Sequence, residues 1–366
     1  MATRSPALSW TNVVPVVAAL VLAVTWGRDL DTLFVVLVAL VLGATVLAAV
    51  HHAEVVAHRV GEPFGSLVLA VAVTIIEVAL IVTLMVSGGP ESASLARDTV
   101  FAAVMITSNG IVGIALMAGA IRHGFTHFNA EGTGAALATV ATLATLSLVL
   151  PTFTTGQPGP EFTGPQLIFA ALASLALYGM FVFTQTVRHR DFFLPVETDS
   201  GSTDADGDGH ADPPTTKAAL TSLGLLLLAL VAVVGLAKVE SPAIEAGVKA
   251  VGFPPSFVGV VIALLVLLPE TLAAVRAALR ERIQISLNLA YGSAMASIGL
   301  TIPAIAVATI WLDGPLMLGL GATQMVLFGL TIVVSVLTVV PGRATRLQGG
   351  VHLVLLAAFL FLAVNP

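Results

Sequence analysis

The sequence predicts an all-α polytopic membrane protein with about eleven transmembrane helices. Of its 366 residues, 57% are hydrophobic and only 10% are charged, and the mean hydropathy is +1.02. Soluble domains carry about 25% charged residues, so this chain cannot build a water-facing surface. With no cysteine, 15 Lys and Arg and a net charge of −6, disulfides, thiolate metal sites and nucleic-acid binding are excluded. The expected surroundings are a lipid bilayer, and a soluble enzyme is excluded.

Eleven apolar runs approach the roughly 20 residues that a bilayer-spanning helix needs. They cover residues 12–26, 32–50, 65–87, 98–120, 134–152, 164–187, 218–237, 256–275, 285–311, 315–340 and 347–364. The first run is short and follows Arg4, a pattern shared with signal peptides. Ala23-Val24-Thr25-Trp26 is a poor cleavage site, so we expect a retained helix.

Basic residues set the expected orientation, because cytoplasmic loops carry an excess of Lys and Arg. With the N-terminus inside, the cytoplasmic segments hold 11 of them: Arg4, Arg59, Arg122, Arg188, Arg190, Lys217, Arg276, Arg280, Arg282, Arg343 and Arg346. The other side holds four: Arg28, Arg97, Lys238 and Lys249. Eleven spans then leave the C-terminus external, in the cytoplasmic (inner) membrane.

A polar, acidic segment rich in Gly and Pro divides the spans after the first into five and five. We expect an extra N-terminal helix in residues 1–30, one repeat in 31–190, an acidic cytoplasmic linker in 191–216 and a second repeat in 217–366. The linker has too little apolar content to pack. Two halves of five spans enter the membrane from opposite sides, as in the inverted repeats of many secondary transporters.

Two glutamates lie deep within apolar runs, at matching places in the two halves. Glu77 is in the second span of the first five, and Glu270 is in the second span of the last five. A carboxylate at this depth costs several kcal/mol unless it is protonated or paired. No Lys or Arg lies near the centre of an apolar run, so the expected partner is a proton or a mobile cation. The alternative is a protonated glutamate that only joins helices.

Several polar residues could complete an oxygen cage around these glutamates. Asn109 and Ser297 align in the following spans, Ser293 precedes Ser297 by one turn, and Thr74 precedes Glu77 by one turn. Pro269 removes one helical hydrogen bond and frees a carbonyl. All-oxygen cages suit hard cations, above all Ca²⁺. The alternatives are interhelical hydrogen bonds and, for Thr74, a bond to its own helix.

Three titratable residues near the end of the second span share a helical face: His51, Glu54 and His58. They indicate a proton relay or a vestibule for cations, with a polar helix end or a zinc site as alternatives. In the linker, Asp204, Asp206 and Asp208 match the opening of an EF-hand loop, but Thr215 replaces its final Glu. These aspartates indicate weak Ca²⁺ sensing or an inert linker.

The sequence resembles the calcium/cation antiporter superfamily, and within it the bacterial ChaA-type branch of the calcium/proton exchangers. The resemblance rests on Glu54-Val-Val-Ala-His-Arg-Val-Gly-Glu-Pro-Phe-Gly65 leading to Thr74-Ile-Ile-Glu77, on Thr107-Ser-Asn-Gly110, on Leu268-Pro-Glu270 and on Asn288–Pro303. It implies two five-helix repeats, a midplane site around the paired glutamates, and cation export driven by protons. Many exchangers have Gly-Asn-Ala-Thr-Glu where this chain has Val73-Thr-Ile-Ile-Glu77, and a glutamine where it has Ala296.

We therefore expect a Ca²⁺/H⁺ antiporter in which Glu77 and Glu270 bind either one divalent cation or protons. A Na⁺/H⁺ or K⁺/H⁺ antiporter on the same scaffold is the alternative. No enzyme motif and no repeated channel filter stands in the spans, so neither an enzyme nor a channel is expected. No cofactor is expected, the partners are inorganic cations and lipid, and a homo-oligomer is left open.

Overall fold

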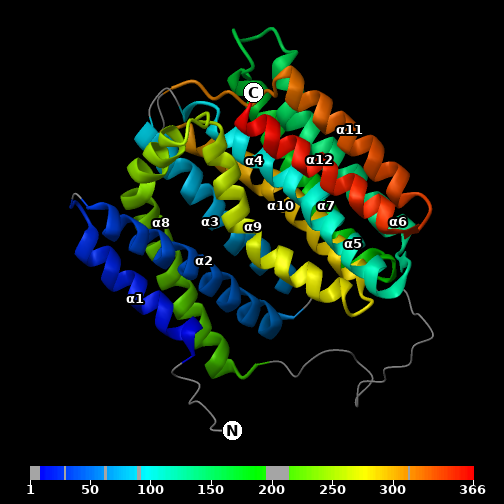
Figure 1. Cartoon of the computed structure of the whole chain (residues 1–366), viewed down its shortest axis with the longest axis horizontal. Helices are drawn as coiled ribbons and strands as arrows, with labels where there is room; N and C mark the ends of the chain where they lie inside the picture. Colours follow the sequence, from blue (N-terminus) through cyan, green and yellow to red (C-terminus); the bar gives the residue numbers. More distant parts are fainter. Residues whose placement is uncertain (1–8, 29, 62–63, 89–91, 195–213, 312–313) are drawn as a thin grey trace.

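The computed structural model describes residues 9–28, 30–61, 64–88, 92–194, 214–311 and 314–366. Within these residues the chain forms eleven helical stretches (Figure 1). Nine are long and apolar enough to cross a membrane, and two shorter apolar helices cover Trp10–Thr25 and Ala70–Val86. The all-α polytopic fold with about eleven membrane helices is confirmed.

The first half of the chain contains the helices up to residue 193. The first three are α1 (Trp10–Thr25), α2 (Thr32–Val60) and α3 (Phe64–Gly88). The next stretch is one continuous helix made of α4 (Leu95–Met105), the π-helical η3 (Ile106–Ile111) and α5 (Val112–His123). It is followed by α6 (Ala130–Ala144), which η4 (Thr145–Val149) and η5 (Leu150–Thr152) continue, by α7 (Gly164–Phe183), which η6 (Thr184–Arg188) continues, and by η7 (Arg190–Phe193).

The second half contains five helices. They are α8 (Thr216–Ala250), α9 (Phe257–Ala278), α10 (Ile283–Ala308), α11 (Ala322–Val339) and α12 (Arg346–Val364). Two short strands, β1 (Thr126–His127) and β2 (Arg343–Ala344), pair antiparallel and join the loops of the two halves.

Two helices are much longer than their apolar runs. α2 continues to Val60 and α8 continues to Ala250. In α2, a polar residue of this extension finds partners inside the bundle. His52 is 1% exposed, and its ring nitrogens lie 3.2 Å from Ser222 Oγ and 3.0 Å from the Thr11 carbonyl oxygen. A prediction based on uninterrupted apolar runs ends the helix at such polar residues, although the helix itself continues.

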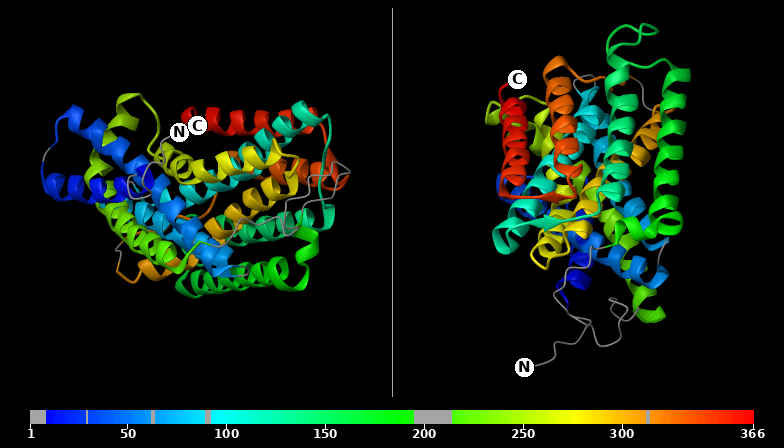
Figure 2. Two further views of the ribbon diagram at one scale, coloured as in Figure 1. Left: turned by 90° about the horizontal axis from the view of Figure 1, so that it is seen from below. Right: turned by 90° about the vertical axis from the view of Figure 1, so that its right-hand side faces the viewer.

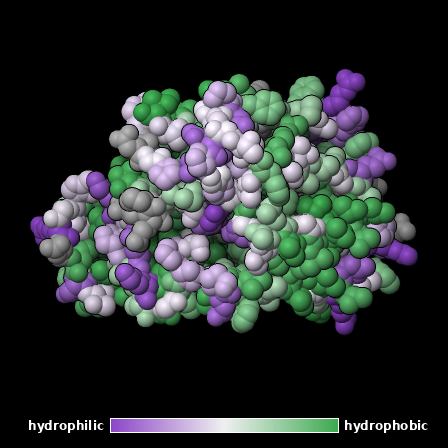
Figure 3. All heavy atoms as spheres, turned by 90° about the horizontal axis from the view of Figure 1, so that it is seen from above, coloured by the Kyte–Doolittle hydropathy of each residue, from purple (hydrophilic) through white to green (hydrophobic). Residues whose placement is uncertain are grey.

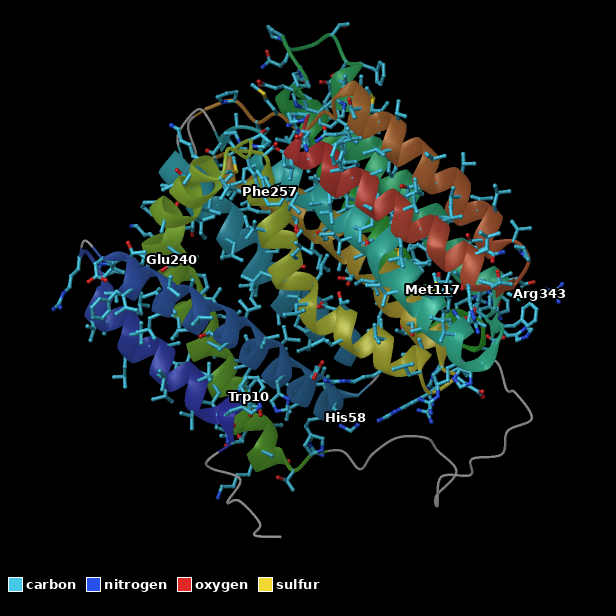
Figure 4. All side chains as sticks on the ribbon, in the orientation of Figure 1. Trp10, His58, Met117, Glu240, Phe257 and Arg343 are labelled. Atoms are coloured by element: carbon cyan, nitrogen blue, oxygen red, sulfur yellow. The ribbon has the colours of Figure 1, made fainter. Side chains whose placement is uncertain are left out.

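The helices alternate in direction across the bundle. We call the side where α2 and α7 end and α8 begins the α7–α8 side, which is the lower side in Figure 1. Trp10 lies toward that side and the C-terminus lies at the opposite side (Figures 1 and 4). Figure 2 shows α11 and α12 side by side along one flank.

The two sets of five helices pack in a reciprocal manner. α3, the second helix of the first set, packs on α10, the third helix of the second set. α9, the second helix of the second set, packs on α4, the third helix of the first. This reciprocal packing is what an inverted repeat requires, and it brings the two acidic helices to the centre.

Large apolar side chains cover much of the outer surface. Leu33, Ile168, Val231, Val336 and Val354 are between 43% and 77% exposed, and Figure 3 shows a broad apolar area on one flank. An apolar surface of this extent is unstable in water and stable against lipid. The chain is therefore a multi-pass membrane protein.

Candidate functional site

One cavity of about 740 Å³ lies where the two sets of helices meet. Its polar lining comprises Glu54, His58, Thr74, Glu77, Tyr178, Gln185, Arg190, Glu270, Asn288, Ser293 and Ser297. Glu54, His58 and Arg190 are exposed and mark its mouth at the α7–α8 side. The structure therefore brings both predicted glutamates into one space that is open at that side.

Glu77 lies on α3 and is 4% exposed. Ser297 Oγ on α10 donates a hydrogen bond of 2.6 Å to Glu77 Oε1. This short distance is typical of a hydroxyl bound to a charged carboxylate. The bond joins the two sets of helices and fixes one oxygen of Glu77, while the carboxylate still lines the cavity.

Glu270 lies on α9 directly after Pro269, and its buried Oε2 has no hydrogen-bond partner among the described residues. The carboxylates of Glu54 and Glu77 line the same cavity as Glu270. The ion pairs among the described residues are Arg97–Asp98 and His123–Glu281, and neither involves these glutamates. An unpartnered buried carboxylate costs several kcal/mol unless a proton or cation joins it, so this site favours binding one or the other.

Three of the predicted oxygen ligands also line the cavity. Thr74 is 7% exposed and lies one turn before Glu77, and Ser293 and Ser297 lie on the facing side of α10. Ala296 lies between the two serines and contributes no donor atom. The hydroxyl and carboxylate oxygens are thus together, as predicted from their spacing.

Asn109 is placed differently from the prediction. It does not line the cavity; its Nδ2 donates to Thr331 Oγ1 at 3.0 Å, and its Oδ1 lies 3.2 Å from Nδ1 of the buried His352. Asn109 belongs to the π-helical segment η3, and such a segment turns its side chains away from the directions of a regular α-helix, which the alignment of Asn109 with Ser297 did not take into account. In this structure its side chain connects α11 and α12 to η3.

The vestibule residues are partly brought together. Glu54 and His58 line the cavity with Ala57 and Gly61, and Figure 4 shows His58 at the lower end of α2. His51 is exposed and is not part of the lining. Across the residues that the structure describes, no three His, Asp or Glu side chains form a metal-holding group, so a zinc site here has no support. Asp204, Asp206 and Asp208 fall outside the described residues.

Four polar lining residues escaped the sequence argument: Tyr178, Gln185, Arg190 and Asn288. Asn288 precedes Gly292 and Ala296 by four and eight residues, which puts these three residues on one face of α10. Its side chain is engaged, since Nδ2 donates to the Phe193 carbonyl at 2.6 Å. Tyr178, Gln185 and Arg190 lie on α7, η6 and η7, which carry no motif.

The opposite side is closed above the glutamates. A Cβ at Gly259 on α9 would lie 2.7 Å from the Thr99 backbone nitrogen on α4, so these helices touch backbone to backbone. Asp98, the residue before Thr99, belongs to the same contact, and its carboxylate accepts from Arg97 and from Ser94 Oγ, both at 2.8 Å. Among the described residues, the site is therefore open toward the α7–α8 side and covered at the opposite side, which is a state expected of an alternating-access transporter.

Comparisons with known proteins support this interpretation. The sodium/calcium exchanger protein family matches residues 30–187 and 221–365. A putative ionic transporter of Sinorhizobium fredii, y4hA, is 44% identical over 98% of this chain and 96% of its own. The sodium-potassium/proton antiporter ChaA of Escherichia coli is 34% identical over 96% of this chain and 95% of its own.

Two solved structures have the same fold. YfkE superimposes with a TM-score of 0.71 at 13% identity, covering 97% of this chain and all of that one. The H⁺/Ca²⁺ exchanger CAX gives a TM-score of 0.68 at 15% identity, covering 96% of this chain and 86% of that one.

Proposed function

Because the chain belongs to the sodium/calcium exchanger family, we propose that it exchanges Ca²⁺ for protons across the cytoplasmic membrane. The observation that carries this proposal is the meeting of Glu77 and Glu270, from reciprocal helices, in one cavity open at one side. Two carboxylates neutralise one divalent cation, and two protons neutralise the same pair. Both loaded states are then uncharged at the glutamates, whereas the empty site carries two negative charges in a low-dielectric region.

The site holds either the cation or the protons and never both, and this exclusive occupancy couples the flux of the cation to the flux of protons. The site changes access readily when it holds the cation or the protons, because it is then electrically balanced. The empty, doubly charged site changes access rarely. Ser293, Ser297 and Thr74 add hydroxyl oxygens on two facing helices, and hydroxyl and carboxylate oxygens suit a hard cation. The protein acts as a transporter without a resident cofactor and catalyses no covalent chemistry.

The α7–α8 side is the cytoplasmic side in this proposal. Of the 14 Lys and Arg residues that the structure describes, 10 belong to the segments at this side together with the N-terminal end of α1, and such an excess marks the cytoplasmic face. The C-terminus is then external, and the cavity faces inward. Residues 31–190 and 217–366 act as the two repeats around the site, joined by residues 191–216.

A monovalent cation is the second candidate substrate. The relative that is 34% identical is named a sodium-potassium/proton antiporter. The lining also has Ala296 where many exchangers have an amide ligand. Fewer ligands favour a cation of lower charge, so Na⁺ or K⁺ remains the alternative on the same two glutamates.

The test is dissipation of a pH gradient in everted membrane vesicles, with Ca²⁺, Na⁺ and K⁺ added in turn. The proposal expects a response to Ca²⁺ at lower concentration than to either monovalent ion. A response to Na⁺ or K⁺ and none to Ca²⁺ assigns the alternative substrate. A response to none of the three, with the protein correctly inserted, refutes cation/proton exchange.

A further inference from the structure

A ten-residue pattern occurs twice, once at the end of the first helix of each five-helix set. It reads Glu54-Val-Val-Ala-His58-Arg-Val60-Gly61-Glu-Pro63 in the first set. In the second set it reads Glu245-Ala-Gly-Val-Lys249-Ala-Val251-Gly252-Phe-Pro254. The acid, the basic residue four places on, the Val-Gly pair and the proline keep the same spacing.

The two copies also share one backbone feature. Gly61 and Gly252 both have φ of +75°, a value that other residues rarely adopt; Gly61 directly follows the last residue of α2, and Gly252 lies two residues after the last residue of α8. α2 runs toward the α7–α8 side, whereas α8 runs away from it (Figure 1). Equivalent residues of the two copies therefore lie at opposite ends of the bundle, with Glu54 at one side and Glu245 at the other.

In this structure the two acids have different surroundings. Glu54 lines the open cavity that leads to Glu77 and Glu270. Glu245 is half-buried, lies outside that cavity and accepts a hydrogen bond of 3.3 Å from the buried Ser241 Oγ. This difference matches a site that is open at one side and closed at the other.

A second carboxyl, that of Glu240, lies five residues before Glu245 on the same helix. Glu240 is 2% exposed, and its Oε1 makes no hydrogen bond among the described residues. Figure 4 shows it on α8, in the half of the bundle away from His58. An unsatisfied buried carboxyl costs several kcal/mol, which is recovered if another conformation of the protein gives it water or a cation.

We propose that Glu245 and Glu240 form the vestibule of the opposite side, the counterpart of Glu54, and that they bind the transported cation when the site opens there. The inference rests on the proposed function. In an inverted repeat, the state open to the other side exchanges the roles of the two sets of helices. The end of α8 then borders the cavity as the end of α2 does now, and Glu245 takes the place of Glu54.

The first test measures the half-saturating cation concentration at each side separately, in oriented proteoliposomes with the other side saturated. Glu245→Gln should raise the half-saturating cation concentration at least fivefold at the opposite side and change it less than twofold at the α7–α8 side. Glu54→Gln is the matched control: it should raise the half-saturating concentration at the α7–α8 side and leave it nearly unchanged at the opposite side. Glu245→Asp keeps the carboxylate and should retain most of the wild-type affinity. Equal changes at both sides, or no change at either, overturn the proposal.

The second test does not need transport activity. A single Cys replaces Glu240 in the naturally cysteine-free chain, and a membrane-impermeant maleimide is applied from the opposite side. Labelling should occur, and its rate should change at least threefold when the transported cation is added. If wild type carries none of the three cations, the proposed function fails but this labelling still decides the inference. The proposal is overturned if no labelling occurs, or if the labelling rate stays the same when Ca²⁺, Na⁺ or K⁺ is added.

Discussion

Removing one hydroxyl beside Glu77 should weaken cation binding by a predictable amount. Ser297→Ala deletes the 2.6 Å bond that Ser297 Oγ donates to Glu77 Oε1. Both side chains are 4% exposed, so water cannot easily replace the lost donor. A hydrogen bond to a charged group contributes about 1.5–3 kcal/mol, which corresponds to about 10- to 150-fold in affinity because 1.4 kcal/mol is tenfold.

The assay is the Ca²⁺ concentration that gives half-maximal dissipation of a pH gradient in everted vesicles. Ser297→Ala should raise that concentration at least tenfold while the protein inserts at wild-type levels. Ser297→Thr keeps the hydroxyl and should stay within about threefold of wild type. If Ser297→Ala stays within twofold, the hydroxyl neither supports Glu77 nor contacts the cation, and the reasoning about this bond is refuted.

Three further predictions concern packing and the linker. Gly259→Ala should destabilise the protein by about 1–3 kcal/mol, because its Cβ would meet the α4 backbone at 2.7 Å; thermal unfolding in detergent measures this, with Gly247→Ala as a control in open space. Asn109→Ala should cost about 1–3 kcal/mol of stability by leaving buried His352 short of a partner, with little change in Ca²⁺ affinity; a tenfold affinity loss at unchanged stability would restore Asn109 as a ligand. Deleting residues 199–212 should preserve transport, because their polar composition offers nothing to pack; abolished transport at normal insertion would contradict this.

The helices and the central pair of glutamates were predictable because membrane burial leaves a strong signal. A run of about 20 apolar residues has few alternatives to a spanning helix, and a carboxylate inside such a run is conspicuous. Thr74 followed from its spacing of three residues before Glu77, and Ser297 followed from the alignment of the two spans that come after the glutamates, with Ser293 one turn earlier. Their predicted meeting required only the reciprocal packing of α3 with α10 and of α4 with α9.

The features that escaped prediction depend on departures from regular periodicity or on partners distant in sequence. Asn109 points elsewhere because η3 is π-helical, and no sequence rule used here signals that change. His52 is buried through contacts with Ser222 and Thr11, both on other helices. Glu240 went unnoticed because it follows an apolar run instead of lying inside one, although its helix continues to Ala250.

The measurement that tests the central claim most directly is cation-driven proton movement in Glu77→Gln, Glu270→Gln and the double variant. Gln keeps the size of the side chain but can neither ionise nor release a proton. Glu131→Gln, at an exposed helix end, is the matched control and should behave as wild type. The account predicts that each single variant, correctly inserted, loses exchange with Ca²⁺, Na⁺ and K⁺. Exchange at wild-type rate in either single variant would contradict the two-glutamate mechanism.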